Sequence, residues 1–201
     1  MVTMDEMDPE IVLDPIALFH VWMRKAEASE WNDPSAVALA TATPDGVPSV
    51  RMVLMKQADH RGFSFYTNAE SQKGMELAAN PRAAMCFHWK SLRRQVRVSG
   101  TVTELSAAEA DDYFGSRPRL SQVGAVASQQ SRLLADRALL VARVRELEKE
   151  FPGEIPRPKY WRGYVLRPES IEFWTSGEGR LHDRILFSRS GKEWRRERLF
   201  P

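Results

Sequence analysis

The stretch that decides the fold runs from residue 36 to residue 67 and reads AVALATATPDGVPSVRMVLMKQADHRGFSFYT. Its β-tolerant segments are separated by two short polar connections, TPDG at 43–46 and DHRG at 59–62. Pro, Asp and Gly at these places have the chemistry of tight turns. The stretch therefore predicts a meander of short antiparallel strands.

The rest of the chain adds helices between further strands. Asp14-Pro15 is typical of a helix start, and Ser106 with Glu109 forms a capping-box pattern. Helices are expected from residue 14 and at 71–79, 106–118 and 131–150, and strands at 82–89, 95–105, 161–166, 171–174, 180–188 and 194–199. Strands dominate, so a mostly β (α+β) closed barrel with flanking helices fits better than a doubly wound α/β sheet.

Length and composition favour one globular domain over residues 14–201, preceded by an acidic, flexible segment at 1–13. The net charge of +2 disfavours nucleic acid as a partner, and strand alternation disperses the cations of 90–97 over two faces. The single cysteine, Cys86, and four scattered histidines predict no metal site. The start of the chain does not read as a signal peptide, and no apolar run reaches about 20 residues, so a cytoplasmic protein without a membrane partner is expected.

Several cations stand where an anionic ligand would explain them. Arg51 and Lys56 flank an apolar strand segment, although their odd spacing places them on opposite faces of a regular strand. Lys73 follows Ser71 at an expected helix start, where free backbone N–H groups favour a phosphate. In both cases the alternative is an ordinary solvated strand end or helix cap.

Two further groups have the same two interpretations. Tyr113, Arg117 and Ser121 are spaced by four, and a phenol, a guanidinium and a hydroxyl suit a phosphate dianion, whereas a solvated helix end is the alternative. In Arg180-Leu-His-Asp-Arg184 a strand would place Arg180, His182 and Arg184 on one face, after the aromatic segment 171–174. That arrangement favours a planar anionic ligand over a solvated outer face.

In order and spacing, these clusters resemble the pyridoxine/pyridoxamine 5'-phosphate oxidase family from about Asp14 to Pro201. The resemblance rests on eight motifs: RMVLMK at 51–56, FYTN at 65–68, SQK at 71–73, RQV at 94–96, YFGSRPR at 113–119, QQS at 129–131, IEFW at 171–174 and RLHDR at 180–184. Each motif is short, but eight in the correct order are specific.

The resemblance implies an FMN-binding split β-barrel and a homodimer with FMN at the subunit interface. The cofactor contacts that it implies are Arg51, Met52, Val53, Leu54, Met55, Lys56, Tyr66, Thr67, Lys73 and Gln95, with Gln130, Ser131, Trp174 and Arg184 coming from the second subunit or its barrel. It implies a substrate phosphate cradle of Lys56, Tyr113, Arg117 and Ser121, and it places Arg180 and His182 over the reacting face as the catalytic pair.

The implied reaction is the FMN-dependent oxidation of pyridoxine 5'-phosphate or pyridoxamine 5'-phosphate, small phosphorylated pyridines, to pyridoxal 5'-phosphate. Oxygen is reduced to hydrogen peroxide, and the protein orients the two rings and neutralises the phosphates. A related flavin oxidase of another small molecule, such as the phenazine-pathway relatives, is the alternative on the same fold. A non-catalytic flavin or pyridoxal phosphate carrier is the alternative from another class.

Three positions depart from the family pattern. Gln72 stands where many relatives carry a second cation for the FMN phosphate. Val126 and Gln129 lie where Trp and Lys are common. The acidic N-terminus lacks the Arg and Tyr segment that closes over the substrate in some relatives.

Overall fold

The computed structural model describes residues 13–201. The expectations for the acidic segment at 1–13 and for a lid formed by the N-terminus therefore lie outside the described residues, except for Leu13. The helices are α1 (Pro15–Ser29), α2 (Gln72–Ala79), α3 (Ala107–Ser116), α4 (Arg119–Ala127) and α5 (Arg137–Glu150). The strands are β1 (Ala36–Ala42), β2 (Pro48–Leu54), β3 (Gln57–Asp59), β4 (Gly62–Asn68), β5 (Arg82–Trp89), β6 (Arg94–Glu104), β7 (Trp161–Thr175), β8 (Asp183–Ser190) and β9 (Glu193–Arg198). A 3-10 turn, Glu178–Arg180, precedes β8.

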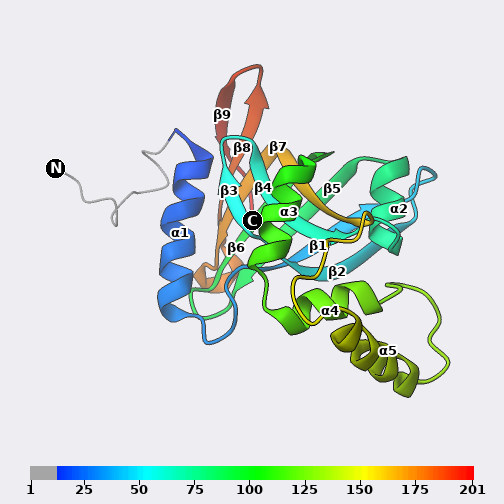
Figure 1. Cartoon of the computed structure of the whole chain (residues 1–201). Coiled ribbons are helices and arrows are strands. Elements are labelled where there is room, and N and C mark those ends of the chain that lie inside the picture. Colours follow the sequence, from blue (N-terminus) through cyan, green and yellow to red (C-terminus); the bar gives the residue numbers. More distant parts are fainter. Residues whose placement is uncertain (1–12) are drawn as a thin grey trace.

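The strands form one antiparallel nine-stranded sheet in the order β2-β1-β5-β6-β7-β4-β3, with β8 on β7 and β9 on β8 (Figure 1). In this ladder β2 and β3 are the ends and do not pair with each other, so the barrel is split rather than closed. The mostly β split-barrel prediction is confirmed, whereas the complete closure expected from the hairpins alone is wrong.

Helix α1 covers one side of the barrel, and α4 and α5 lie together at the opposite end (Figure 1). The N-cap Asp14 accepts a hydrogen bond from the Ile16 N–H, as the sequence predicts. Phe19 and Trp22 of α1 are almost fully buried, and Phe19 packs edge-on against Phe63 of β4 at 4.8 Å. This main core fixes the barrel, while a smaller core around Trp161 joins the α3–α5 end to β7.

Four local expectations are wrong. The long helix begins at Arg137 rather than 131, with Asp136 as its cap, and α4 before it was not expected. The strands expected at 161–166 and 171–174 are one strand, because Pro168 sits at a β-bulge opposite Gly100 and does not end pairing. The strand expected from Arg180 begins only at Asp183. The strand segment that Arg51 and Lys56 were expected to flank ends at Leu54, and the short β3 follows it.

One face of the sheet is apolar and open. The outward residues of β2, Val50, Met52 and Leu54, are exposed by 68%, 64% and 41%. They lie opposite alanines of β1, which in turn pair with β5. On the next strands, His88 of β5 pairs with Gln95 of β6, Gln95 with Trp174 of β7, and Trp174 with Arg184 of β8, so these four residues lie on the same face. The face therefore carries small or apolar residues beside polar ones.

Candidate active site

A cavity of about 750 Å³ lies between β2, β4, the start of α2, and the α3–α4 corner. Thirteen of the expected cofactor and substrate residues line it: Arg51, Met52, Val53, Leu54, Lys56, Tyr66, Thr67, Lys73, Tyr113, Arg117, Ser121, Gln130 and Ser131. Arg51 and Lys56 reach one cavity because β2 ends at Leu54, so the strand alternation that would separate them does not extend to Lys56.

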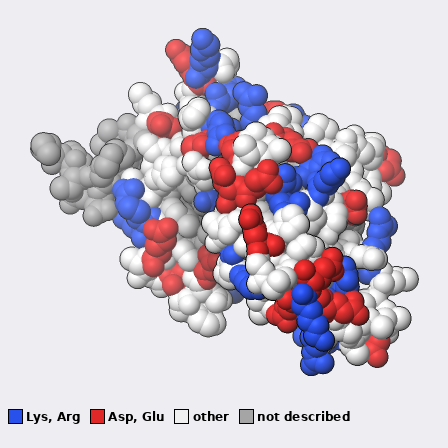
Figure 2. All heavy atoms as spheres, in the orientation of Figure 1, with Lys and Arg blue, Asp and Glu red and all other residues white. Residues whose placement is uncertain are grey.

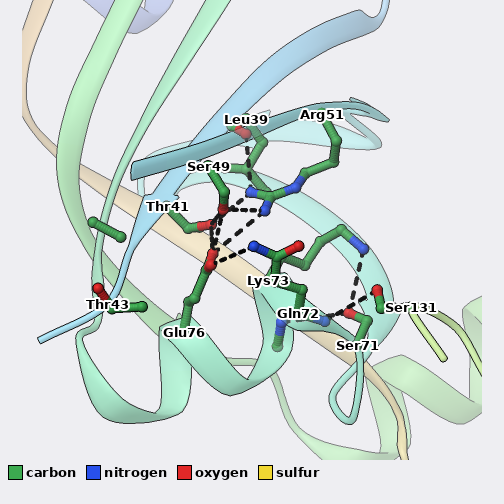
Figure 3. Close-up of polar contacts among 12 residues, drawn as sticks. Leu39, Thr41, Thr43, Ser49, Arg51, Ser71, Gln72, Lys73, Glu76 and Ser131 are labelled. Atoms are coloured by element: carbon green, nitrogen blue, oxygen red, sulfur yellow. Dashed lines mark hydrogen bonds and ion pairs between the residues drawn. The ribbon is translucent and has the colours of Figure 1, made fainter. Parts of the chain in front are cut away.

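Arg51 is held by a network on the inner side of β2 (Figure 3). Its Nη1 donates to the Leu39 carbonyl at 3.2 Å, and its Nη2 lies 3.3 Å from a carboxylate oxygen of Glu76. Glu76 is buried, but hydrogen bonds from Ser49, Thr41 and Gln72 and the charge of Arg51 outweigh the burial and lower the pKa of Glu76 to about 2. Arg51 is therefore fixed by an ionised carboxylate.

Lys73 is a buried cation with no carboxylate among its hydrogen-bond partners in the described chain. Its side chain is 7% exposed, and its Nζ donates to Gln130 Oε1 at 2.9 Å and to the hydroxyls of Thr67 and Ser71 at 3.2 Å. Burial, followed by the nearby charge of Arg51, lowers the pKa of Lys73 to about 8. Such a site favours an anionic ligand that would stabilise the charged ammonium.

The position of Gln72 explains the departure from the family pattern. Its side-chain Nε2 donates to Glu76 Oε1 at 2.9 Å, and its backbone N–H donates to Ser131 Oγ at 3.2 Å. Ser71 caps α2 by accepting from the Gly74 N–H. Gln72 thus holds the Glu76 carboxylate in place, and that carboxylate in turn holds Arg51. The Gln72 side chain therefore supports an existing cation of the site and does not supply a second one.

The expected phosphate cradle converges at the α3–α4 corner. Tyr113 lies on α3, Arg117 is its C-cap, and the turn at Pro118 directs the chain into α4, so that Ser121 reaches the same cavity. Burial lowers the pKa of Arg117, and its Nη1 is buried without a hydrogen-bond partner among the described residues. An unpartnered guanidinium donor beside a cavity is suited to a ligand oxygen.

A stack of aromatic rings forms one wall of the cavity. Tyr66 is stacked on Tyr113 at 4.2 Å and on Trp161 at 5.3 Å. Tyr66 pairs across the ladder with Gly163, where a Cβ would lie 2.7 Å from the Tyr66 ring. The missing side chain at Gly163 therefore lets the ring lie flat against β7.

Most of the remaining expected residues form a second cluster that does not line this cavity. Gln95, Trp174 and Arg184 are direct neighbours on β6, β7 and β8, on the open apolar face of the sheet. Arg184 Nε donates to the buried carboxylate of Glu172 at 2.8 Å, which raises the pKa of Arg184. Met55 belongs to neither group, because its side chain lies in the main core.

Arg180 and His182 lie in a tight turn before β8, so the expectation that a strand aligns them with Arg184 is wrong. Arg180 has a φ of 66° and is exposed, and a Cβ at Gly177 would meet the Leu181 carbonyl oxygen at 1.8 Å. The His182 ring packs on Trp174 at 4.6 Å, and its Nδ1 accepts from the Gly177 N–H at 3.2 Å. The turn thus joins His182 to the second cluster, whereas Arg180 is exposed two residues before it.

Gln130 and Ser131 lie with Lys73 in the first cavity, whereas the resemblance groups them with Trp174 and Arg184. The sequence prediction missed Glu76 and Trp161. For Glu76 a signal was present, because it follows Gln72 by four residues on the same helix face. Trp161 was noted only as a strand start.

The described residues contain no group of three or more His, Cys, Asp or Glu side chains placed to hold a metal ion. On the face shown in Figure 2, positive and negative side chains are interspersed rather than gathered in a basic stripe. Within residues 13–201, no helix has the length and apolarity to cross a membrane.

The fold and the cation-lined cavity define a class, the split-barrel proteins related to flavin oxidases. A solved structure of this class, a pyridoxamine 5'-phosphate oxidase-related, FMN binding protein from Nostoc punctiforme PCC 73102, superposes with a TM-score of 0.74 at 16% identity, covering 95% of this chain and 100% of that one. PhzG from Burkholderia lata 383, solved in complex with tetrahydrophenazine-1-carboxylic acid, superposes with a TM-score of 0.92 at 34% identity over 98% of both chains.

Sequence comparison identifies the family. Residues 23–150 match the family model described as pyridoxamine 5'-phosphate oxidase, and residues 161–201 match the pyridoxine 5'-phosphate oxidase C-terminal dimerisation region. Relatives named pyridoxine/pyridoxamine 5'-phosphate oxidase are 55% identical in Gluconobacter oxydans (strain 621H), over 96% of both chains, and 58% identical in Anaeromyxobacter dehalogenans (strain 2CP-C), over 97% of this chain and 99% of that one. The chain belongs to the pyridoxamine 5'-phosphate oxidase family.

Proposed function

We propose that the protein oxidises pyridoxine 5'-phosphate or pyridoxamine 5'-phosphate to pyridoxal 5'-phosphate, with FMN as cofactor and oxygen as the electron acceptor that becomes hydrogen peroxide. The observation that carries this proposal is two phosphate-suited groups in one cavity, Arg51 with Lys73 and Lys56 with Arg117. Two phosphorylated ligands bound side by side need two such groups. The names of the 55% and 58% identical relatives agree with this activity.

The residues present fit FMN. Lys73 is a buried cation without a carboxylate partner in the described chain, which suits a phosphate, and the backbone of β2 borders the cavity where a flat ring would lie. FMN supplies the two-electron redox chemistry when bound. Arg51, Lys73 and Thr67 bind its phosphate in this proposal, and Tyr66 lies beside them.

The chain's other residues orient the substrate. Lys56, Tyr113, Arg117 and Ser121 bind the substrate phosphate, so the carbon to be oxidised is held at a fixed depth in the cavity. In this proposal Arg180 and His182 cover the reacting face and manage the proton. The cradle also favours a phosphorylated substrate over the carboxylic acid in the PhzG complex, since a carboxylate carries one negative charge, whereas a phosphate dianion can neutralise both Lys56 and Arg117.

The protein is a homodimer, and its finer arrangement is part of the proposal. Gln95, Trp174 and Arg184 lie on the open sheet face together with the exposed side chains of β2. A two-fold dimer that buries this face would place the second cluster of one protomer against the cavity of its partner. FMN would then lie at the subunit interface, with contacts from both chains.

A direct assay tests the function. The purified protein is expected to be yellow, with flavin absorbance, and to form aldehyde and hydrogen peroxide when pyridoxine 5'-phosphate is added under air. A yellow protein that forms no peroxide with either substrate would favour the carrier, and a colourless protein that gains no flavin from added FMN would refute the cofactor. Turnover of a phenazine precursor in preference to both phosphates would favour the alternative oxidase.

A further inference from the structure

The cations of the cavity are held by different kinds of partner. Arg51 is ion-paired with Glu76 at 3.3 Å. Lys56 and Arg117 lie over rings instead: Lys56 Nζ is 5.8 Å from the centre of the Tyr113 ring, and Arg117 Cζ is 4.9 Å from that of Trp161. Within residues 13–201, neither of these two cations has a carboxylate within ion-pair distance.

The side chain of Trp161 is held in one position by its neighbours. It is 6% exposed, its ring is within 16° of parallel to Tyr66 and Tyr113, and the edge of Phe114 meets it at 5.1 Å. It begins β7, so its backbone is fixed by the pairing with Asn68 of β4. A ring confined on these sides keeps its position whether or not a ligand is bound.

A ring and a carboxylate have different effects on the charge that they hold. A carboxylate would cancel most of the Arg117 charge and occupy its N–H groups, whereas a ring face attracts the guanidinium through its quadrupole and leaves both in place. The Arg117 Nη1 is indeed buried with no acceptor in the described chain. The full charge and a free donor are therefore available to a doubly charged phosphate.

We propose that Trp161 is a positioning residue for substrate recognition, which holds Arg117 over its ring so that the guanidinium meets the substrate phosphate. This inference rests on the proposed function. In this inference Trp161 acts on the substrate only through Arg117, and it thereby sets the KM for the phosphorylated pyridine.

The test uses the FMN-saturated enzyme and three variants. Trp161→Leu removes the ring, Trp161→Phe keeps a smaller one, and Arg117→Met removes the cation. For Trp161→Leu we expect the KM for pyridoxine 5'-phosphate to rise about tenfold, which corresponds to about 1.4 kcal/mol, with kcat within about twofold of the wild type. Trp161→Phe is expected to give a smaller rise, of about threefold, and it carries the test if Trp161→Leu does not fold.

A double variant separates positioning from general damage. In the Arg117→Met background, Trp161→Leu is expected to raise the KM no further, because the cation on which it acts is gone. Trp89→Leu is the matched control: this buried tryptophan lies in the main core and donates to the Pro34 carbonyl, so its loss should lower stability and leave the KM unchanged. An unchanged KM in Trp161→Leu, or an equal further rise in the Arg117→Met background, would overturn the proposal.

Direct binding of pyridoxal 5'-phosphate to the holoenzyme, followed by its absorbance, separates this inference from the proposed function. If the wild type does not oxidise either phosphate, the proposed function fails, and the affinity of Trp161→Leu for pyridoxal 5'-phosphate still shows whether the ring positions Arg117. If the wild type is active but neither KM nor this affinity changes in Trp161→Leu, the inference alone fails.

Discussion

FMN affinity should fall at alkaline pH because of Lys73. In the cofactor-free protein its pKa is lowered from 10.5 to about 8, mainly by burial. A bound phosphate favours the ammonium and raises that pKa, so binding above pH 8 requires proton uptake. The contribution of Lys73 is thus complete below about pH 8 and is lost as the pH rises through the pKa of the bound state.

The size of this pH effect follows from the lowered pKa of Lys73. A pKa lowered from 10.5 to about 8 corresponds to about 3 kcal/mol of differential stabilisation between the charged and the neutral side chain. Well above pH 8, where one proton is taken up with each cofactor, the Kd rises about tenfold per pH unit; because Lys73 is only half deprotonated at pH 8, we expect about fivefold weaker affinity at pH 9 than at pH 8. Between pH 8 and pH 10.5, Lys73 is mostly protonated in the unfolded chain and mostly neutral in the folded, cofactor-free protein. The free energy of unfolding of the cofactor-free protein should therefore rise over this pH range.

Flavin fluorescence titrations from pH 7 to pH 9.5 measure this dependence. Riboflavin, which lacks the phosphate, should bind with little change over the same range. Lys73→Met should weaken FMN binding at pH 7, remove the alkaline decline, and stabilise the cofactor-free protein, because a buried charge is gone. The reasoning is refuted if the Lys73→Met variant keeps the same alkaline decline, or if the wild-type Kd is flat to pH 9.5.

Three further changes have defined outcomes. Glu76→Gln should lower the free energy of unfolding by about 3 kcal/mol in urea, since it leaves the partly buried Arg51 without its carboxylate; an unchanged midpoint would contradict the pairing. Arg180→Ala should lower kcat/KM for pyridoxine 5'-phosphate about a hundredfold without changing the FMN Kd, and unchanged turnover would remove its role at the reacting face. Met52→Asp should give monomers in sedimentation velocity, whereas Met75→Asp, which changes a methionine on α2 that is 45% exposed, should not; a dimeric Met52→Asp would argue against the open sheet face as the interface.

Sequence reasoning succeeded where side chains follow the local chain. The turns at 43–46 and 59–62 and the caps Asp14, Ser71 and Ser106 depend on neighbours a few residues away, and the structure has all of them. The cavity-lining positions were also predicted, but by the order of motifs rather than by geometry. From the residues alone, each cation had a solvated alternative.

The failures arise where distant contacts decide. Two strands were expected at 161–166 and 171–174, but they are one strand, because the bulge opposite Gly100 accommodates Pro168 between them. Strand alternation predicted a common face for Arg180 and His182, yet the close approach of Gly177 to the Leu181 carbonyl bends the chain there instead. Glu76 could not be assigned to Arg51 because they are 25 residues apart and meet only in the folded protein, where α2 packs beside β1.

The turn that carries His182 restricts the direction in which this imidazole can exchange a proton. Because Nδ1 accepts the Gly177 N–H, the neutral ring carries its own hydrogen on Nε2. That nitrogen can give a hydrogen bond to an oxygen or nitrogen of a bound molecule, but it has no lone pair to receive one. Acting as a base would require the Gly177 contact to break, so the proton role proposed for His182 depends on the opening of this turn.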